Sequence, residues 1–197
     1  MKYLIILLSS ILFGSCANRY LNYDFEMDHP VKSKQLYYEN DSFSIAYEMR
    51  QQYIEFTILN KLNDGLRINW DEVSFSINGK TYRAVHKETG VYKINDVQPP
   101  TTIPPKSSLN DFIIPSDNIR YSNVTTRSYY IAKDIFPVEA TGKKKLAKAI
   151  STYRGTKITI FMPFYVSGKY QSYYYDIIVR NITDSKNPTA KTPLPKK

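Results

Sequence analysis

Hydrophobic and polar residues alternate with a period of two along most of this chain. In one segment Phe43, Ile45 and Tyr47 fall on one side, whereas Ser44 and Glu48 fall on the other. Such alternation is typical of β-strands with one buried face. We therefore predict strands wherever it recurs, at residues 43–49, 54–58, 73–77, 81–86, 158–166 and 173–179.

Short turn motifs join these predicted strands into hairpins. Asn78-Gly79 separates two of them and predicts a type I′ turn, and Ser167-Gly168 separates the last two. Pro163 has no backbone N–H, which predicts that its strand lies at a sheet edge or carries a bulge. Weaker signals predict short extended runs at 66–70 and 111–115, and a stiff polyproline connector at 97–106.

Helical periodicity is confined to one short segment. Leu146 and Ile150 lie one helical turn apart and predict a helix at residues 143–150. Many short strands with turn signals between them predict an all-β fold, namely an antiparallel immunoglobulin-like β-sandwich with at most one short helix. This domain is expected to span residues 36–183, with a polar, flexible tether at 16–35 and a disordered basic tail at 184–197.

The first sixteen residues have the pattern of a secretory signal. Lys2 gives a positive start, residues 3–13 are apolar but too short to span a bilayer, and small residues follow. Cys16 comes next and is the only cysteine of the chain. The segment Phe13-Gly14-Ser15-Cys16 resembles the lipobox of bacterial lipoproteins. The resemblance implies that residues 1–15 are a lipoprotein signal peptide and that Cys16 is acylated, which would anchor the protein in a membrane.

A second resemblance covers about two thirds of the chain. Its motifs are short and lie at Asn60, 66–71, Ser74, His86, 99–101, 103–105, 111–115 and 162–175. They look like a group of Bacteroidota-type envelope lipoproteins that have an immunoglobulin-like domain and no settled activity. The resemblance implies a fold and a location. Ala17, a non-acidic residue after Cys16, implies sorting to the outer membrane with the domain facing the periplasm.

The positive charge of the chain is unevenly distributed. Lys and Arg number 27 against 18 Asp and Glu, a net charge of +9, and Lys143, Lys144, Lys145 and Lys148 form one cluster. Basic groups beside aromatic residues can bind single-stranded nucleic acid, but an exported protein rarely meets it, so we expect no nucleic-acid partner. Contact with anionic lipid head groups and a simply solvated surface both stay open for this cluster.

The sequence contains no recognisable catalytic pattern, and we predict no enzymatic activity, no cofactor and no metal site. One Cys and two His exclude a cysteine-based zinc site and a multi-histidine relay. His86 is expected to be a hydrogen-bonded structural residue, and His29 a solvated residue of the tether. Trp70 and Asp71 could bind a glycan by ring stacking and hydroxyl hydrogen bonds. We favour the alternative, a core tryptophan with Asp71 accepting backbone N–H groups.

Adjacent tyrosines give the best indication of function. At three places tyrosines follow one another directly, and neighbours on a strand point to opposite faces, so some of them must be exposed. Exposed tyrosine is enriched at protein interfaces, which makes Tyr37, Tyr129 and Tyr174 candidate partner-binding residues. We predict a lipid-anchored, non-enzymatic binding or scaffolding module, accessory to an outer-membrane assembly. The alternatives are a glycan-binding module that uses Trp70 and exposed tyrosines and, with less support, a small hydrolase.

Overall fold

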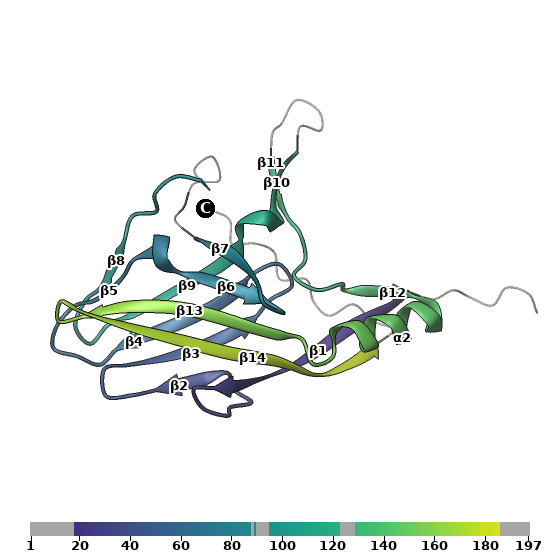
Figure 1. The fold of residues 1–197 in the computed structure, drawn as a ribbon, viewed down its shortest axis with the longest axis horizontal. Helices are drawn as coiled ribbons and strands as arrows, with labels where there is room; N and C mark the ends of the chain where they lie inside the picture. Colours follow the sequence, from purple (N-terminus) through teal and green to yellow (C-terminus); the bar gives the residue numbers. More distant parts are fainter. Residues whose placement is uncertain (1–17, 88, 90–94, 123–128, 186–197) are drawn as a thin grey trace, which may run out of the picture.

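The computed structural model of the protein describes residues 18–87, 89, 95–122 and 129–185 (Figure 1). Within these residues most regular structure is antiparallel β-strand. The strands are β1 (Asn18–His29), β2 (Tyr37–Glu39), β3 (Phe43–Met49), β4 (Ile54–Asn60), β5 (Leu66–Ile68), β6 (Ser74–Ile77), β7 (Lys80–His86), β8 (Thr101–Ile103), β9 (Ser108–Pro115), β10 (Ile119–Ser122), β11 (Tyr129–Ala132), β12 (Glu139–Thr141), β13 (Lys157–Val166) and β14 (Lys169–Ser185). The described α-helix is α2 (Gly142–Tyr153), and 3-10 turns lie at Trp70–Glu72 and Ser116–Asn118.

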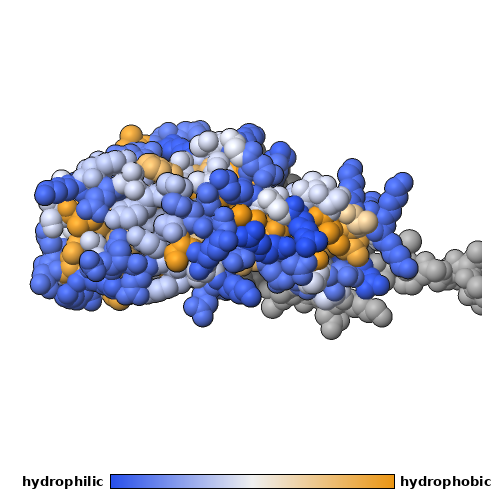
Figure 2. All heavy atoms as spheres, turned by 60° about the horizontal axis from the view of Figure 1, so that its bottom comes forward, coloured by the Kyte–Doolittle hydropathy of each residue, from blue (hydrophilic) through white to orange (hydrophobic). Residues whose placement is uncertain are grey.

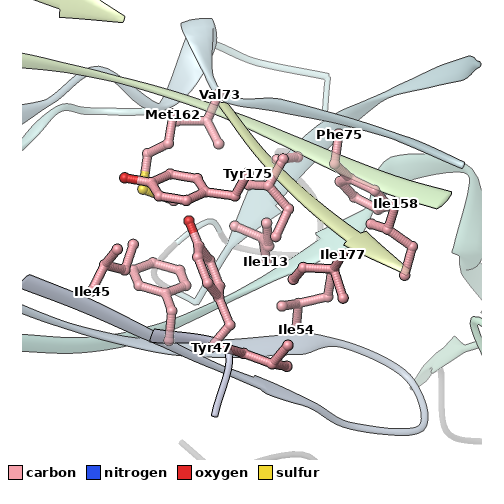
Figure 3. Packing of buried hydrophobic residues seen from close by; sticks show 14 of the residues in the cluster. Ile45, Tyr47, Ile54, Val73, Phe75, Ile113, Ile158, Met162, Tyr175 and Ile177 are labelled. Carbon is pink, nitrogen blue, oxygen red and sulfur yellow. The ribbon is translucent and has the colours of Figure 1, made fainter. Parts of the chain in front are cut away.

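Most strands belong to one antiparallel sheet with the order β12-β1-β14-β13-β6-β7-β9-β4-β3-β2. β5 pairs with the far end of β13 and with β8, and β10 and β11 form a separate hairpin. The sheet turns at β7, where residues 80–83 pair with β6 and residues 84–86 pair with β9. The sheet thereby curls into a half-barrel whose two halves face each other across the core (Figure 1, Figure 3).

The all-β prediction is confirmed. The predicted segments 43–49, 54–58, 73–77, 81–86, 158–166 and 173–179 lie within β3, β4, β6, β7, β13 and β14, except that β6 begins one residue later than predicted. Each predicted hairpin turn has two successive residues at positive φ, Asn78 and Gly79 at 49° and 82°, Ser167 and Gly168 at 47° and 77°, as a type I′ turn requires. The strand order does not establish the immunoglobulin-like subtype, because β7 joins the two halves where a sandwich has two separate sheets.

Side chains from the two halves of the sheet meet in the core. In Figure 3, Ile45, Tyr47 and Ile54 of β3 and β4 point toward Met162 and Tyr175 of β13 and β14, and all five are buried. The hydroxyl groups of Tyr47 and Tyr175 have no hydrogen-bond partner in the described part of the chain. Burial raises the pKa of both phenols. The two rings therefore fill the core but leave buried polar atoms unsatisfied.

The predicted tether at 16–35 is wrong over residues 18–29. Asn18–His29 form β1, which pairs with β12 at its start and with β14 along most of its length. The reason is visible in the sequence, because Leu21, Tyr23, Phe25 and Met27 alternate with polar residues. Leu21 and Met27 are buried, and Tyr23 and Phe25 pack against the core. The domain thus begins at least as early as residue 18.

Two predictions about proline-containing segments also need correction. β13 is an inner strand and not an edge strand, because β14 pairs with it on one side and β6 and β5 pair with it on the other. β6 pairs with β13 up to Phe161 and β5 pairs from Phe164, so Pro163 lies in the gap between them. Its missing N–H therefore costs no hydrogen bond on that side. Within the predicted polyproline connector 97–106, Thr101–Ile103 form β8.

The predicted helix is confirmed and is longer than expected. α2 covers Gly142–Tyr153 and packs against β12, β14 and β1 through Leu146, Ile150 and Tyr153.

The predicted basic tail starts slightly later than expected, because β14 continues to Ser185. The remaining residues, 186–197, lie outside the described part of the chain.

Candidate functional site

His86 and Asp111 form a buried pair on the inner face of β7 and β9. Nδ1 of His86 lies 3.3 Å from Oδ2 of Asp111. The backbone N–H groups of Lys87 and Phe112 donate to Oδ1 of the same carboxylate at 3.1 and 2.7 Å. Only 2% of the His86 side chain and 4% of the Asp111 side chain are exposed, so a substrate has no access to them. The pair acts as an internal polar contact between β7 and β9, as expected for a structural histidine.

Trp70 covers one face of the His86 imidazole. The two rings are stacked, with centroids 4.2 Å apart and an interplanar angle of 6°. Nε1 of Trp70 donates to Oγ1 of Thr101 at 2.8 Å, and the residue is 1% exposed. A glycan-stacking residue must present an open ring face. The interpretation of Trp70 as such a residue is therefore wrong, and the favoured interpretation of a core tryptophan describes it.

Asp71 and Gln98 continue this polar cluster toward the surface. Oδ1 of Asp71 accepts hydrogen bonds from Nη2 of Arg83 at 2.7 Å and from the backbone N–H of Gln98 at 3.1 Å. Oε1 of Gln98 accepts from the backbone N–H of His86 at 3.2 Å and from the hydroxyl of Thr89 at 2.6 Å. These bonds fasten the segment around Gln98 along β7. Asp71 thus accepts a backbone N–H as predicted, although the donor lies far along the chain.

A second cluster lies on the outer face of β13 and β14 and is open to solvent. Tyr170 and Tyr174 of β14 are 52% and 48% exposed. In the strand register Phe161 of β13 is opposite Tyr174, and Tyr165 is opposite Tyr170 with ring centroids 5.5 Å apart. Alternation places these four side chains on the face that points away from the core. We call these four residues, together with His29, the aromatic face.

His29 completes the aromatic face from the neighbouring strand. It is the last residue of β1, opposite Asp176 of β14, and its ring stacks on Tyr174 with centroids 4.0 Å apart and an interplanar angle of 5°. The expectation of a solvated tether residue was wrong, because β1 continues to this position. The stack restrains the Tyr174 ring, which lowers the conformational entropy that a bound partner would have to remove.

Polar groups border the aromatic face. The hydroxyl of Tyr165 donates to Oε1 of Glu72 at 3.2 Å, and the amide of Asn69 donates to the same oxygen at 2.7 Å. Burial, together with this hydrogen bond, raises the pKa of the Tyr165 phenol. On another side Lys157 forms an ion pair with Asp176 at 3.1 Å. Aromatic rings within a polar rim are typical of protein-binding surfaces.

The tyrosines predicted to bind a partner are not gathered into one site by the contacts of the described residues. Tyr174 belongs to the aromatic face. Tyr37 lies in the edge strand β2, is 37% exposed and donates to Oε2 of Glu39 at 2.5 Å. Tyr129 begins β11 in the separate hairpin, and its side chain is outside what the structure describes. Cys16 also lies outside the described residues, so its acylation stays a prediction.

The chain matches no family model, and no curated protein or solved structure resembles it significantly. Across residues 18–185, where described, no helix is long and apolar enough to cross a membrane. The same residues contain no group of three or more His, Cys, Asp or Glu placed to hold a metal ion. The choice of a candidate site therefore depends on geometry. The polar cluster around His86 is closed to solvent, whereas the aromatic face is open to it.

Proposed function

We propose that the protein is a non-enzymatic binding module of the bacterial cell envelope that recognises a protein partner through the aromatic face. The observation that carries this proposal is the exposure of Tyr170 and Tyr174 on a regular, hydrogen-bonded sheet. An anchor at acylated Cys16, a periplasm-facing position at the outer membrane and the immunoglobulin-like subtype belong to the same proposal. These three rest on the resemblance of the sequence to envelope lipoproteins.

The shape and chemistry of the aromatic face suit a protein better than a small molecule. Small ligands bind in concave pockets that cover most of their surface. The outer face of a curled sheet is convex, and it offers large rings whose neighbours hold them in place. Tyrosine contributes much contact area for little lost freedom, which is why it recurs among the residues that dominate binding energy.

Each alternative function loses part of its support. A glycan-binding module was to use Trp70 together with exposed tyrosines, and the Trp70 ring is buried against His86. A hydrolase would need an accessible acid or base, and the His86–Asp111 pair is enclosed by the core. A buried Trp70 together with exposed tyrosines on the sheet favours a protein partner.

The experiment that tests this proposal compares the wild type with Tyr170→Ala/Tyr174→Ala after affinity purification from the native membrane. Copurifying proteins are quantified by mass spectrometry, and thermal melts report stability. Leu59→Ala is the matched control, because Leu59 is 41% exposed on β4 in the other half of the sheet. We expect the double variant to recover at least about tenfold less partner. Its stability should change by only about 0.5 kcal/mol per exposed substitution.

Two outcomes would contradict the proposal. Equal recovery with the double variant would show that the aromatic face does not bind the partner. Equal losses with the double variant and with Leu59→Ala would show that the binding energy is not specific to β13 and β14.

A further inference from the structure

α2 presents a strongly basic surface to solvent. Lys143, Lys144, Lys145 and Lys148 are all exposed, whereas Leu146, Ala149, Ile150 and Tyr153 pack against the core. No acidic residue occurs in the helix sequence. Among the described residues none of these four lysines forms an ion pair. Figure 2 shows long hydrophilic side chains projecting at the end of the molecule to which α2 belongs.

The stability of α2 does not account for these lysines. Three of them occupy the first turn, where the partial positive charge of the helix dipole disfavours cations. The acids of β12 and of the last part of β14, two strands that pack against α2, are too few to neutralise them. Asp184 is paired with Arg19 at 2.9 Å, and β12 contributes a single carboxylate, that of Glu139, against four lysines. The cluster is therefore a site of uncompensated positive charge, which an external polyanion would complement.

The strand register places this charge beside the start of the domain. Asn18, the first residue of β1, pairs with Thr141, and α2 begins at the next residue, Gly142. Cys16 precedes Asn18 by two residues, which reach at most about 7 Å when extended. α2 is twelve residues long, or about 18 Å, so all four lysines lie close to the point where the chain leaves toward Cys16. Figure 1 shows β1 starting beside α2, at the right.

We infer that the lysine surface of α2 binds the anionic phospholipid head groups of the membrane in which Cys16 is anchored. This inference rests on the proposed acylation of Cys16. Lysines next to a lipid anchor gain about fivefold in partition per charge on an anionic surface. Two attachments, one hydrophobic and one electrostatic, fix the α2 end of the domain against the bilayer. They thereby orient the aromatic face relative to the membrane.

The first test uses the acylated full-length protein reconstituted into phosphatidylcholine vesicles with or without phosphatidylglycerol. A brief pulse of an amine-acetylating reagent, read by mass spectrometry, measures the accessibility of each lysine. We expect the four α2 lysines to react several-fold more slowly when phosphatidylglycerol is present, and high salt to remove the difference. Lys32, Lys34, Lys87 and Lys169, which are exposed outside α2, serve as internal controls and should not change. Equal rates on both vesicles for the α2 lysines would overturn the inference.

The second test removes the anchor, so that its outcome does not depend on acylation. The chain from residue 16 onward with Cys16→Ser keeps every described residue, and its thermal melt confirms folding. Its sedimentation with phosphatidylglycerol vesicles is compared with that of Lys143→Gln/Lys144→Gln/Lys145→Gln/Lys148→Gln. The control, Lys32→Gln/Lys34→Gln/Lys87→Gln/Lys169→Gln, removes the same charge elsewhere. We expect at least about tenfold weaker binding for the α2 variant and little change for the control. Equal binding of the two variants would overturn the inference.

Discussion

Two tyrosine hydroxyls in the core make a prediction at the scale of single residues. Tyr47 and Tyr175 are buried with ring centroids 5.2 Å apart, and neither hydroxyl has a hydrogen-bond partner among the described residues. Tyr47→Phe and Tyr175→Phe keep the ring and remove the unsatisfied oxygen. We expect each to raise the free energy of unfolding by about 1 kcal/mol, measured by denaturant titration.

A matched substitution separates this effect from a general preference for phenylalanine. The hydroxyl of Tyr23 donates to the carbonyl oxygen of Pro137 at 2.6 Å, so Tyr23→Phe should lower stability by about 1 kcal/mol. If Tyr47→Phe and Tyr175→Phe destabilise the protein as Tyr23→Phe does, their hydroxyl groups have partners and the argument is wrong.

The residue-scale features that could be predicted from the sequence are those set by alternation along one strand. The tyrosines 173–175 alternate between inside and outside as expected, with Tyr175 buried and Tyr174 exposed. The same alternation, applied to β13, would have identified Phe161 and Tyr165 as outward residues of the aromatic face. The His86–Asp111 pair could not be found in this way, because the two residues lie on different strands and meet only in the folded sheet.

At the scale of elements, β1 carries the clearest prediction. Met27 is fully buried in β1 and contacts the core formed by residues far along the chain. Met27→Ala should lower the free energy of unfolding by about 2–5 kcal/mol, the range for a truncated core side chain. Lys32→Ala, an exposed site just after β1, should change it by less than about 0.5 kcal/mol. Denaturant titration measures the free energy of unfolding of both variants. Equal small changes for Met27→Ala and Lys32→Ala would show that residues 18–29 are a tether and not part of the domain.

β1 was not predicted from the sequence, because the interactions that stabilise this strand are with residues far along the chain. Its buried residues alternate, but they stand among charged and amide residues and are followed by Pro30, which together suggest a solvated linker. The partner that stabilises it, β14, lies about 160 residues later, as the pairing of Tyr23 with Ile182 shows. In contrast, β6–β7 and β13–β14 are hairpins whose turns are encoded between their strands, so they could be predicted. Pro163 follows the same rule, because only the break between β5 and β6 makes it acceptable in an inner strand.

At the scale of the whole molecule, the curled sheet separates two surfaces along one axis. In Figure 1 the β13–β14 hairpin and α2 lie at opposite ends. Tyr165 and Tyr170 of the aromatic face lie near that hairpin, whereas β1 starts and β14 ends beside α2. If the α2 end rests on the membrane, the hairpin end of the aromatic face extends away from it and stays open to a partner. Alternation predicts that strands exist, but this arrangement depends on the pairing of the start of β1 with the end of β14, which no local pattern encodes.

The anchor itself is tested by removing the only thiol. Two or three acyl chains on Cys16 would retain the domain in the membrane, because each buried methylene contributes about 0.8 kcal/mol. We expect a fatty-acid label to mark the wild type and not Cys16→Ala, and the variant to leave the membrane fraction or to keep its signal peptide. Adding Asn18→Cys to Cys16→Ala is the control, since it restores a thiol two residues away. If acylation requires the position after Gly14-Ser15, the restored thiol stays unlabelled. Equal labelling of the wild type and Cys16→Ala would refute the lipid anchor. Lipid binding by α2 would then still be decided by the sedimentation of the unacylated chain with vesicles.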